Sequence, residues 1–203
     1  KIVDVGSGLS APSKLWRDLY PEASLFDVNI NFKQLLFSGS EKNIEFLNST
    51  STKLPFGNDS VDRVLALESA QHFKPLSDFL SESKRILKKS GLLVLAVPVT
   101  LNDSSFSKLG LLKFTWSSEH YDLDFLKNLI ISSGFSISEE KLIGSDVYDP
   151  LTTYYSKNRS RLKVEILKSY APYVEKILYK SLQKMKKASE EKIIDYVLLK
   201  CRL

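Results

Sequence analysis

A Gly-x-Gly turn close to the start of the chain is the first feature that could bind a ligand. The short, apolar run Ile2 to Val5 leads directly into Gly6 and Gly8. Such a turn after a strand can present backbone N–H groups to a nucleotide-like ligand. The glycines can adopt positive φ and leave room beside the main chain, and Asp4 supplies a carboxylate for a cationic or hydroxyl group. A tight turn without a ligand is an equally open interpretation.

A second carboxylate follows along the chain at a comparable place. Residues 24–28 are expected to form a strand that contains Asp27 and Val28 near its end. In a βαβ unit this position lies beside the first Gly-rich turn. We therefore expect the Asp27 carboxylate to accept hydrogen bonds from a ribose diol. The alternative is an acidic residue in an ordinary turn after the strand.

Four blocks of residues in a fixed order resemble the class I S-adenosylmethionine-dependent methyltransferases. They are Asp-Val-Gly-Ser-Gly at 4–8, Leu-Phe-Asp-Val-Asn at 25–29, Lys-Leu-Pro-Phe at 53–56 with Ser-Val-Asp-Arg-Val at 60–64, and Gly-Leu-Leu-Val-Leu at 91–95. The resemblance covers about residues 1–143. It implies S-adenosyl-L-methionine as the cofactor, with Ser7 joining Asp4, Gly6 and Gly8 around its methionine end and Val28 beside Asp27 at its ribose.

The same resemblance implies that residues 48–56 contact the adenine. Family members usually carry Gly-Asp-Ala before Leu-Pro-Phe, and the Asp reads the adenine amino group. Here Thr50 and Ser51 occupy the Asp-Ala positions. A hydroxyl can still accept the hydrogen bond, but the loss of the charge predicts a weaker contact.

The segment Glu-Ser-Ala-Gln-His-Phe at 68–73 follows an expected buried strand at 61–67. Family members carry a similar segment that touches the cofactor and faces the acceptor, which implies roles for Glu68 and Phe73. His72 could act as a general base on a substrate hydroxyl, because imidazole exchanges protons near neutral pH. A structural histidine that bonds its own loop is the competing interpretation, since methyl transfer often needs only proximity and in-line alignment.

A long loop is expected at 99–118, after a strand that ends at Pro98. Loops of this length in a compact domain are usually functional, and this one falls at the ligand-binding edge of the sheet. We expect its Phe114 and Trp116 to line an acceptor pocket together with His72, Phe73 and Tyr154. Packing of these aromatic side chains in the core is an equal alternative.

The elements that must position these residues alternate between strands and helices. Strands are expected at 2–5, 24–28, 44–47, 61–67, 92–97, 136–143 and 193–203. Helices are expected at 11–20 (capped by Ser10), 31–38, 76–89, 121–133 and 159–189, the last interrupted near Pro172. This order indicates an α/β fold. The resemblance implies a single domain over residues 1–203 with a Rossmann-like seven-stranded sheet, mostly parallel, an antiparallel last strand and helices on both faces.

The resemblance also places a helical insertion at 144–192, before the last strand, as a substrate cap or partner surface. Within it, residues 151–192 hold 11 Lys and Arg against 4 Asp and Glu, while the rest of the chain holds 18 against 20. The basic character is therefore local. It can mark a surface for nucleic acid or anionic lipid, although a solvated helix face is the more ordinary interpretation.

Composition narrows the class of protein. An apolar content of 43% is typical of a globular domain, and no apolar run approaches the roughly 20 residues of a membrane span. Cys201 is the only cysteine, which excludes an internal disulfide, and the two histidines are too few to indicate a metal site. We therefore expect a cytoplasmic protein without a metal. Because the chain begins inside an expected strand, we also expect a segment upstream of Lys1.

Three functions fit these observations. The first is transfer of a methyl group from S-adenosylmethionine to an oxygen, nitrogen or carbon of a small molecule; the insertion resembles those of methyltransferases acting on sterols and polyketide sugars. The second is an RNA or protein acceptor docked by the basic insertion, against which stand the lack of an Asn-Pro-Pro-Tyr segment and of a well-placed catalytic cysteine. The third is a catalytically silent binding module, which Ser10 in place of a third glycine would fit.

Overall fold

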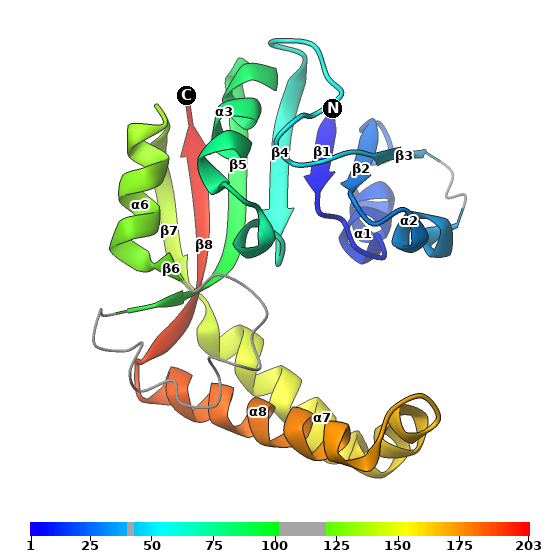
Figure 1. Cartoon of the computed structure of the whole chain (residues 1–203). Helices are drawn as coiled ribbons and strands as arrows, with labels where there is room; N and C mark the ends of the chain where they lie inside the picture. Colours follow the sequence, from blue (N-terminus) through cyan, green and yellow to red (C-terminus); the bar gives the residue numbers. More distant parts are fainter. Residues whose placement is uncertain (40–42, 102–120) are drawn as a thin grey trace. The chain divides into compact units, whose positions relative to one another are not determined.

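The computed structural model describes residues 1–39, 43–101 and 121–203 (Figure 1). The chain divides into two compact units. The first consists of Lys1–Val97, Asp124–Lys141 and Leu198–Leu203. The second consists of Pro98–Leu123 and Leu142–Val197 and contains nearly all of the expected helical insertion.

Within the described ranges, eight strands form one sheet in the order β3-β2-β1-β4-β5-β8-β7, with β6 paired to β5. Their bounds are β1 Ile2–Val5, β2 Leu25–Asn29, β3 Ile44–Asn48, β4 Val61–Leu67, β5 Leu87–Thr100, β6 Tyr121–Asp122, β7 Ser136–Leu142 and β8 Ile194–Arg202. Strands β1 to β5 pair in parallel, and β8 runs in the opposite direction (Figure 1). The predicted Rossmann-like fold with its antiparallel last strand is thus confirmed.

The helices alternate with the strands. Their bounds are α1 Ala11–Leu19, α2 Phe32–Ser38, α3 Leu76–Ile86, α6 Leu123–Ser132, α7 Gly144–Leu167 and α8 Pro172–Glu190, with a 3₁₀ turn η1 at Ala70–His72. Helices α1, α2, α3 and α6 surround the sheet, whereas α7 and α8 form a hairpin in the second unit (Figure 1). Among the helices of the described ranges, none is both long and apolar enough to cross a membrane.

The core of the first unit forms between the central strands and the apolar face of α3. Val64 and Ala66 of β4 and Phe79, Leu80 and Ile86 of α3 are fully buried. Strands covered by helices lose most of their solvent contact, which is why the part of β5 from Leu92 to Val99 is a continuous apolar run. This packing fixes the sheet edge at which β1, β2 and β4 end.

The end of α3 and the continuation of β5 past Pro98 differ from the expectation because tertiary contacts outweigh local signals. Helix α3 ends at Ile86, since buried Leu87 already pairs with Val61 as part of β5. Pro98 does not end β5: it falls between the pairing with β4, which ends at Ala96, and the pairing with β6, which begins at Val99. A proline is tolerated at such a position because no ladder hydrogen bond is required of it.

The β6 pairing also shortens the expected helix at 121–133, because Tyr121 pairs with Val99 and α6 begins at Leu123. This short strand makes the eighth of a sheet expected to have seven. Helix α7 begins at Gly144 rather than at 159 and continues through Pro150. Its first turn is held because the Gly144 N–H donates to Asp195 Oδ1 at 2.8 Å.

Helix starts show how side chains replace the missing backbone partners. Asn31 caps α2 by accepting hydrogen bonds from the N–H groups of Lys33 and Gln34. Ser10 was expected to cap α1 in the same way. It instead adopts a left-handed conformation, makes no cap hydrogen bond, and donates its hydroxyl to Ser38 Oγ at 3.1 Å.

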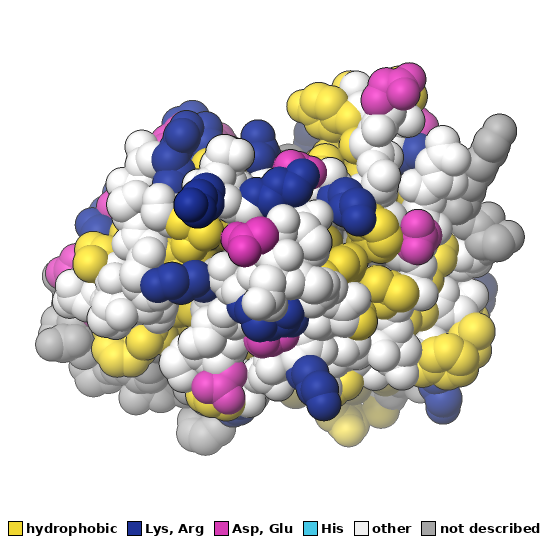
Figure 2. Space-filling view, turned by 90° about the horizontal axis from the view of Figure 1, so that it is seen from above, with side chains coloured by type: hydrophobic (Ala, Val, Ile, Leu, Met, Phe, Trp, Pro, Cys, Tyr) yellow, Lys and Arg dark blue, Asp and Glu magenta, His cyan; other side chains and the backbone are white. Residues whose placement is uncertain are grey.

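Charged side chains are mixed over the face seen in Figure 2, the view from above Figure 1. Lysine and arginine side chains alternate there with acidic and apolar ones and do not gather in one patch. A mixed distribution of this kind is ordinary for the surface of a globular domain.

Candidate cofactor-binding site

A cavity of about 520 Å³ opens in the first unit at the carboxyl ends of four parallel strands. Its size falls within the range of about 300–1,000 Å³ typical of small-molecule sites. The carboxyl edge is where open α/β sheets bind ligands. The lining residues come from the last residues of these strands and the segments that follow them: Val5, Gly6 and Gly8 from β1 onward; Val28, Asn29, Ile30 and Gln34 from β2 onward; Ser49, Thr50, Ser51 and Thr52 after β3; and Glu68, Ser69, His72, Phe73 and Lys74 after β4.

The Gly-rich turn forms one wall of the cavity. Gly6 and Gly8 adopt positive φ, 78° and 57°, a conformation that favours glycine. A Cβ at Gly6 would clash with the Ser69 side chain, whereas a Cβ at Gly8 would meet no atom within 4 Å. Gly8 thus leaves the backbone open toward the cavity, and Gly6 is needed for packing against the loop after β4. Ser7 is buried and does not line the cavity.

The N–H groups of this turn are partly used within the protein. Gly6 N–H donates to the carbonyl of Val28 at 2.7 Å, and Ser7 N–H donates to the same oxygen at 3.3 Å. The Ser69 hydroxyl donates to the carbonyl of Val5 at 2.6 Å. The turn is therefore hydrogen-bonded to β2 and to the loop after β4, and these contacts connect three walls of the cavity.

Asp4 and Asp27 do not line the cavity. They are partners in the register of β1 and β2, and both side chains are buried. Asp27 accepts a hydrogen bond from the Ser13 hydroxyl of α1, so its carboxylate lies on the helix side of the sheet. The position that the structure gives Asp27 does not support the expected hydrogen bond to a ribose.

Burial controls the protonation of this pair. Burial, and to a lesser extent the nearby Asp27 carboxylate, together raise the pKa of Asp4 to about 8. Burial likewise raises the pKa of Asp27, while hydrogen bonds from Ser10 and Ser13 act in the opposite direction. The two side chains thus form a buried carboxyl pair next to the Gly-rich turn, and one oxygen of each, Asp4 Oδ1 and Asp27 Oδ2, has no hydrogen-bond partner among the described residues.

Asn29 and Gln34 occupy the wall where Asp27 was expected. The Asn29 amide donates to the Gly8 carbonyl at 3.2 Å and to Gln34 Oε1 at 2.9 Å. Asn29 Oδ1 accepts the Asn31 N–H at 3.0 Å. These contacts hold two polar amides against the Gly-rich turn. In the sequence, the Asn-Ile-Asn at 29–31, directly after the expected strand at 24–28, could have indicated polar side chains at this wall. The observed strand β2 ends one residue later than expected, at Asn29.

The loop after β3 supplies hydroxyl groups, as expected for Thr50 and Ser51. Thr50 Oγ1 lies 3.2 Å from Thr52 Oγ1, and the Ser49 hydroxyl donates to the Lys53 carbonyl at 2.7 Å. Four consecutive hydroxyl side chains, residues 49–52, therefore line this side of the cavity. Such groups can donate or accept hydrogen bonds but carry no charge.

Helix α3 fixes the chain that continues from this loop. Glu82 accepts the N–H of Leu54 at 2.8 Å, and the Arg85 guanidinium donates to the carbonyls of Leu54 and Phe56 at 3.0 and 2.8 Å. Arg85 and Glu82 also pair at 2.7 Å. The backbone on this side of the cavity is thus anchored by a helix rather than left to the loop.

The segment after β4 forms the opposite wall. Glu68 has a positive φ of 55°, and its N–H donates to the Ala96 carbonyl at 2.9 Å. The η1 turn follows, in which the His72 N–H donates to the Ser69 carbonyl at 2.9 Å and the His72 side chain is exposed. Phe73 packs against Phe79 of α3 with ring centroids 4.7 Å apart. The cavity therefore brings Glu68, His72 and Phe73 together.

Three further residues were expected to line an acceptor pocket. Phe114 and Trp116 lie outside the described residues. Tyr154 belongs to α7 in the second unit, where its side chain is exposed and its hydroxyl accepts a hydrogen bond from Arg161 at 3.1 Å.

Comparisons with known proteins show that part of this chain is similar to methyltransferases. Residues 3–95 match the family model described as a methyltransferase domain. The chain is 29% identical over 112 residues to erythromycin 3''-O-methyltransferase of Saccharopolyspora erythraea. The matched stretch covers 51% of this chain and 37% of that protein. It is 32% identical over 101 residues to a sterol 24-C-methyltransferase of Gibberella zeae, 45% of this chain and 26% of that protein. The chain thus matches less than half the length of either relative.

Solved structures show the same fold. The cyclopropane synthase MmaA2 of Mycobacterium tuberculosis superposes with a TM-score of 0.84 at 16% identity, covering 100% of this chain and 77% of that one. The geranyl diphosphate C-methyltransferase of Streptomyces coelicolor superposes with a TM-score of 0.73 at 15% identity, and the match covers 99% of this chain and 70% of that one. The architecture is therefore that of a Rossmann-like methyltransferase. Over residues 3–95 the chain is similar to a methyltransferase domain.

Proposed function

We propose that this protein is a methyltransferase that uses S-adenosyl-L-methionine and acts on a small molecule. The observation that carries the proposal is the cavity itself. Four segments that are distant in the sequence, at the ends of β1, β2, β3 and β4, converge on it, and each contains at least one residue expected from the family resemblance. The match of residues 3–95 to the methyltransferase domain covers all four segments and supports the same conclusion.

The residues present fit the cofactor. The backbone at Gly8, open toward the cavity, accommodates a ligand that lies against the main chain. We assign the ribose hydroxyls to the amides of Asn29 and Gln34, and the adenine to the hydroxyl-bearing loop at Thr50 and Ser51. Glu68 is assigned to the methionine end, because its carboxylate follows β4 at the edge of the same cavity. When bound, the cofactor supplies a methyl group on a positively charged sulfur, which is the electrophile of the reaction.

The chain's own residues then have two tasks. The cavity walls align the acceptor with the methyl group and exclude water, which accounts for much of the rate in such reactions. An oxygen or nitrogen acceptor must also lose a proton. His72 is exposed on the cavity lining, and we assign the removal of that proton to a ring nitrogen of His72. A carbon acceptor would place other demands on the site.

The relatives indicate the class of acceptor. Their names describe methylation of erythromycin and of sterols, and one solved neighbour is named for geranyl diphosphate. All are small molecules with large apolar parts. We therefore propose a small-molecule acceptor with a large apolar part. Analysis of the methylated product would then identify the atom that receives the methyl group.

Calorimetric titration with S-adenosylmethionine and S-adenosylhomocysteine tests the cofactor site. We expect binding of both, and we expect Thr50→Val to weaken it about threefold to tenfold, because one hydrogen bond contributes about 0.5–1.5 kcal/mol. Thr153→Val is the matched control, since Thr153 is an exposed threonine of α7. Absence of binding to the folded protein would overturn the proposal, and equal loss in both variants would remove the adenine assignment.

A further inference from the structure

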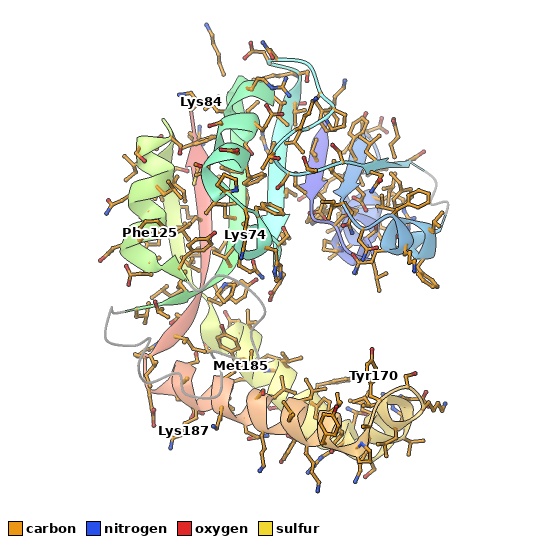
Figure 3. All side chains as sticks on the ribbon, in the orientation of Figure 1. Lys74, Lys84, Phe125, Tyr170, Met185 and Lys187 are labelled. Carbon is orange, nitrogen blue, oxygen red and sulfur yellow. The ribbon has the colours of Figure 1, made fainter. Side chains whose placement is uncertain are left out.

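The end of the α7–α8 hairpin exposes several large apolar side chains. We call residues 161–180 the hairpin tip; it includes the last turns of α7, the connection at 168–171 and the first turns of α8. Val164 and Leu167 lie one turn apart on α7, and Tyr173 and Ile177 lie one turn apart on α8. Tyr170 lies in the connection and is 62% exposed, at the end of the hairpin remote from Met185 and Lys187 (Figure 3).

The exposed charges of the hairpin tip are almost all positive. Five basic side chains are exposed there against a single exposed carboxylate. The basic residues are Arg161, Lys163, Lys168, Lys176 and Lys180, and the acidic one is Glu165. The other carboxylate of the segment, Glu175, is fully buried. The tip therefore presents a local positive charge that a partner of opposite charge would complement.

Buried contacts hold this end of the hairpin in shape. Arg159 of α7 pairs with Glu175 of α8 through contacts of 2.8 and 3.3 Å, and the Tyr155 hydroxyl lies 3.5 Å from the same carboxylate. The Arg159 guanidinium also lies over the Tyr179 ring at 3.7 Å from its centroid. The tip is thus presented by two helices that are locked together, and ordering it on binding costs little entropy.

The combination of groups selects the kind of partner. Lysines alone would suit any polyanion. Val164, Leu167 and Ile177, however, are branched aliphatic side chains, and neither water nor a phosphate backbone stabilises them. Tyrosine is the residue type that favours the boundary between an apolar phase and water, because its ring is apolar and its hydroxyl is polar. The surface of a bilayer can accommodate both the basic and the apolar side chains, with the apolar side chains inserted between the lipids and the lysines at the headgroups.

We propose that the hairpin tip docks on the surface of an anionic lipid bilayer. The insertion would be shallow, about 5–10 Å, as for other interfacial helices. The docking does not depend on methyl transfer. Combined with the proposed function, it favours an acceptor that is itself an amphiphile, which the enzyme would meet at the lipid surface.

Sedimentation with vesicles tests the electrostatic part. The full chain without cofactor is mixed with vesicles of phosphatidylcholine alone or with added phosphatidylglycerol. We expect binding to the anionic vesicles, weakened by salt, and weakened about thirty-fold in Lys163→Gln/Lys176→Gln, since each lysine near such a surface contributes about 1 kcal/mol. The matched control is Lys184→Gln/Lys187→Gln, which removes two exposed lysines of α8 from its other end.

A second pair of variants tests the apolar part. Tyr170→Ser/Tyr173→Ser should weaken vesicle binding at low and at high salt, whereas Leu151→Ser, an exposed position near the start of α7, should not. Unchanged thermal unfolding midpoints would show that the variants fold. Equal binding to uncharged vesicles, or binding that no tip variant weakens, would overturn the proposal. So would binding to polyuridylate with no binding to vesicles, an outcome that would indicate a nucleic-acid surface.

These outcomes are independent of the cofactor site. Failure of S-adenosylmethionine binding with intact vesicle binding would remove the proposed function and leave the docking proposal standing. The reverse result would remove the docking and leave the enzyme.

Discussion

At the scale of single residues, the carboxyl groups whose pKa values are raised by burial are not the side chains that line the cavity. Asp4 and Asp27 are buried behind the Gly-rich turn, while Asn29, Gln34 and the hydroxyls of 49–52 face the cavity. Buried carboxyl groups without ionic partners tend to remain protonated. Burial therefore favours the neutral form of Asp4, while the charged residues of the site, Glu68 and Lys74, lie on the cavity lining itself.

The Asp4 carboxyl should make the stability of the fold depend on pH. Its pKa is about 8 in the folded protein, against an ordinary value of 3.8. The folded state therefore binds the proton more tightly, so the stabilisation is complete below about pH 4 and is lost as the pH rises through about 8. Asp4→Asn should flatten this decline in the free energy of unfolding, which urea titrations between pH 4 and pH 8.5 would measure.

Asp62 provides a control of opposite sign for the same titrations. A hydrogen bond from Lys88 lowers its pKa to about 2, so its stabilisation is present at neutral pH and is lost only as the pH falls through about 2. Asp62→Asn should leave the slope between pH 4 and pH 8.5 unchanged. Because burial also raises the pKa of Asp27, a shallower slope should remain in Asp4→Asn. A slope as steep as that of the unmodified protein would show that Asp4 is ionised in the folded state.

At the scale of elements, the sequence predicted where ligand-binding segments lie but not which side chain each segment presents. The alternation of apolar strands and amphipathic helices was sufficient for the α/β fold, and Gly6, Gly8, Thr50, Ser51, Glu68 and His72 all reach the cavity. The choice between Asp27 and Asn29 depends on one residue in the length of β2. The two side chains lie two residues apart and therefore on the same face of β2. They differ in their position along the strand: Asn29 is its last residue and lines the cavity, whereas Asp27 is fully buried and bonded to Ser13 of α1.

Long-range contacts account for the boundaries that the sequence did not predict. Local signals at Pro98 and Pro150 indicate a break, yet β5 and α7 continue through them. Buried Tyr148, Thr152 and Tyr155 show that packing within the second unit stabilises α7 on both sides of Pro150. Tertiary packing of this kind outweighs local propensity, and one sequence read alone does not reveal it.

Helix α3 controls one wall of the cavity through Arg85. Its guanidinium bonds the carbonyls of Leu54 and Phe56, Asn58 Oδ1 and Glu82 at once, an arrangement that depends on the planar fork of arginine. Arg85→Lys keeps the charge but cannot make all these contacts. We expect it to weaken S-adenosylhomocysteine binding about threefold to tenfold, because the 49–52 loop loses its anchor.

Calorimetry of Arg85→Lys beside Arg202→Lys would separate this effect from a general one, since Arg202 is exposed at the end of β8. The free energy of unfolding should fall by about 1 kcal/mol in Arg85→Lys only. Wild-type affinity in that variant would show that the loop holds its shape without α3.

At the scale of the whole molecule, two compact units share strands β5 and β8 but have separate sets of buried residues. The first contains the cavity, and the second contains the α7–α8 hairpin and its basic tip. The charge follows the same division, since the basic excess lies within residues 151–192. This separation suits a protein that binds a cofactor with one unit and a surface with the other.

Hydrogen exchange would show whether the units open independently. Glu175→Gln removes the charge of a fully buried carboxylate that accepts hydrogen bonds from Arg159 and lies beside the Tyr155 hydroxyl. The loss of a hydrogen bond between charged groups costs about 1.5–3 kcal/mol. We expect amides of α7 and α8 to exchange several-fold faster, with amides of β1 to β4 unchanged. Glu165→Gln is the matched control, because the Glu165 pair with Lys168 is exposed and contributes little. Faster exchange throughout the chain in Glu175→Gln would mean that the two units unfold as one.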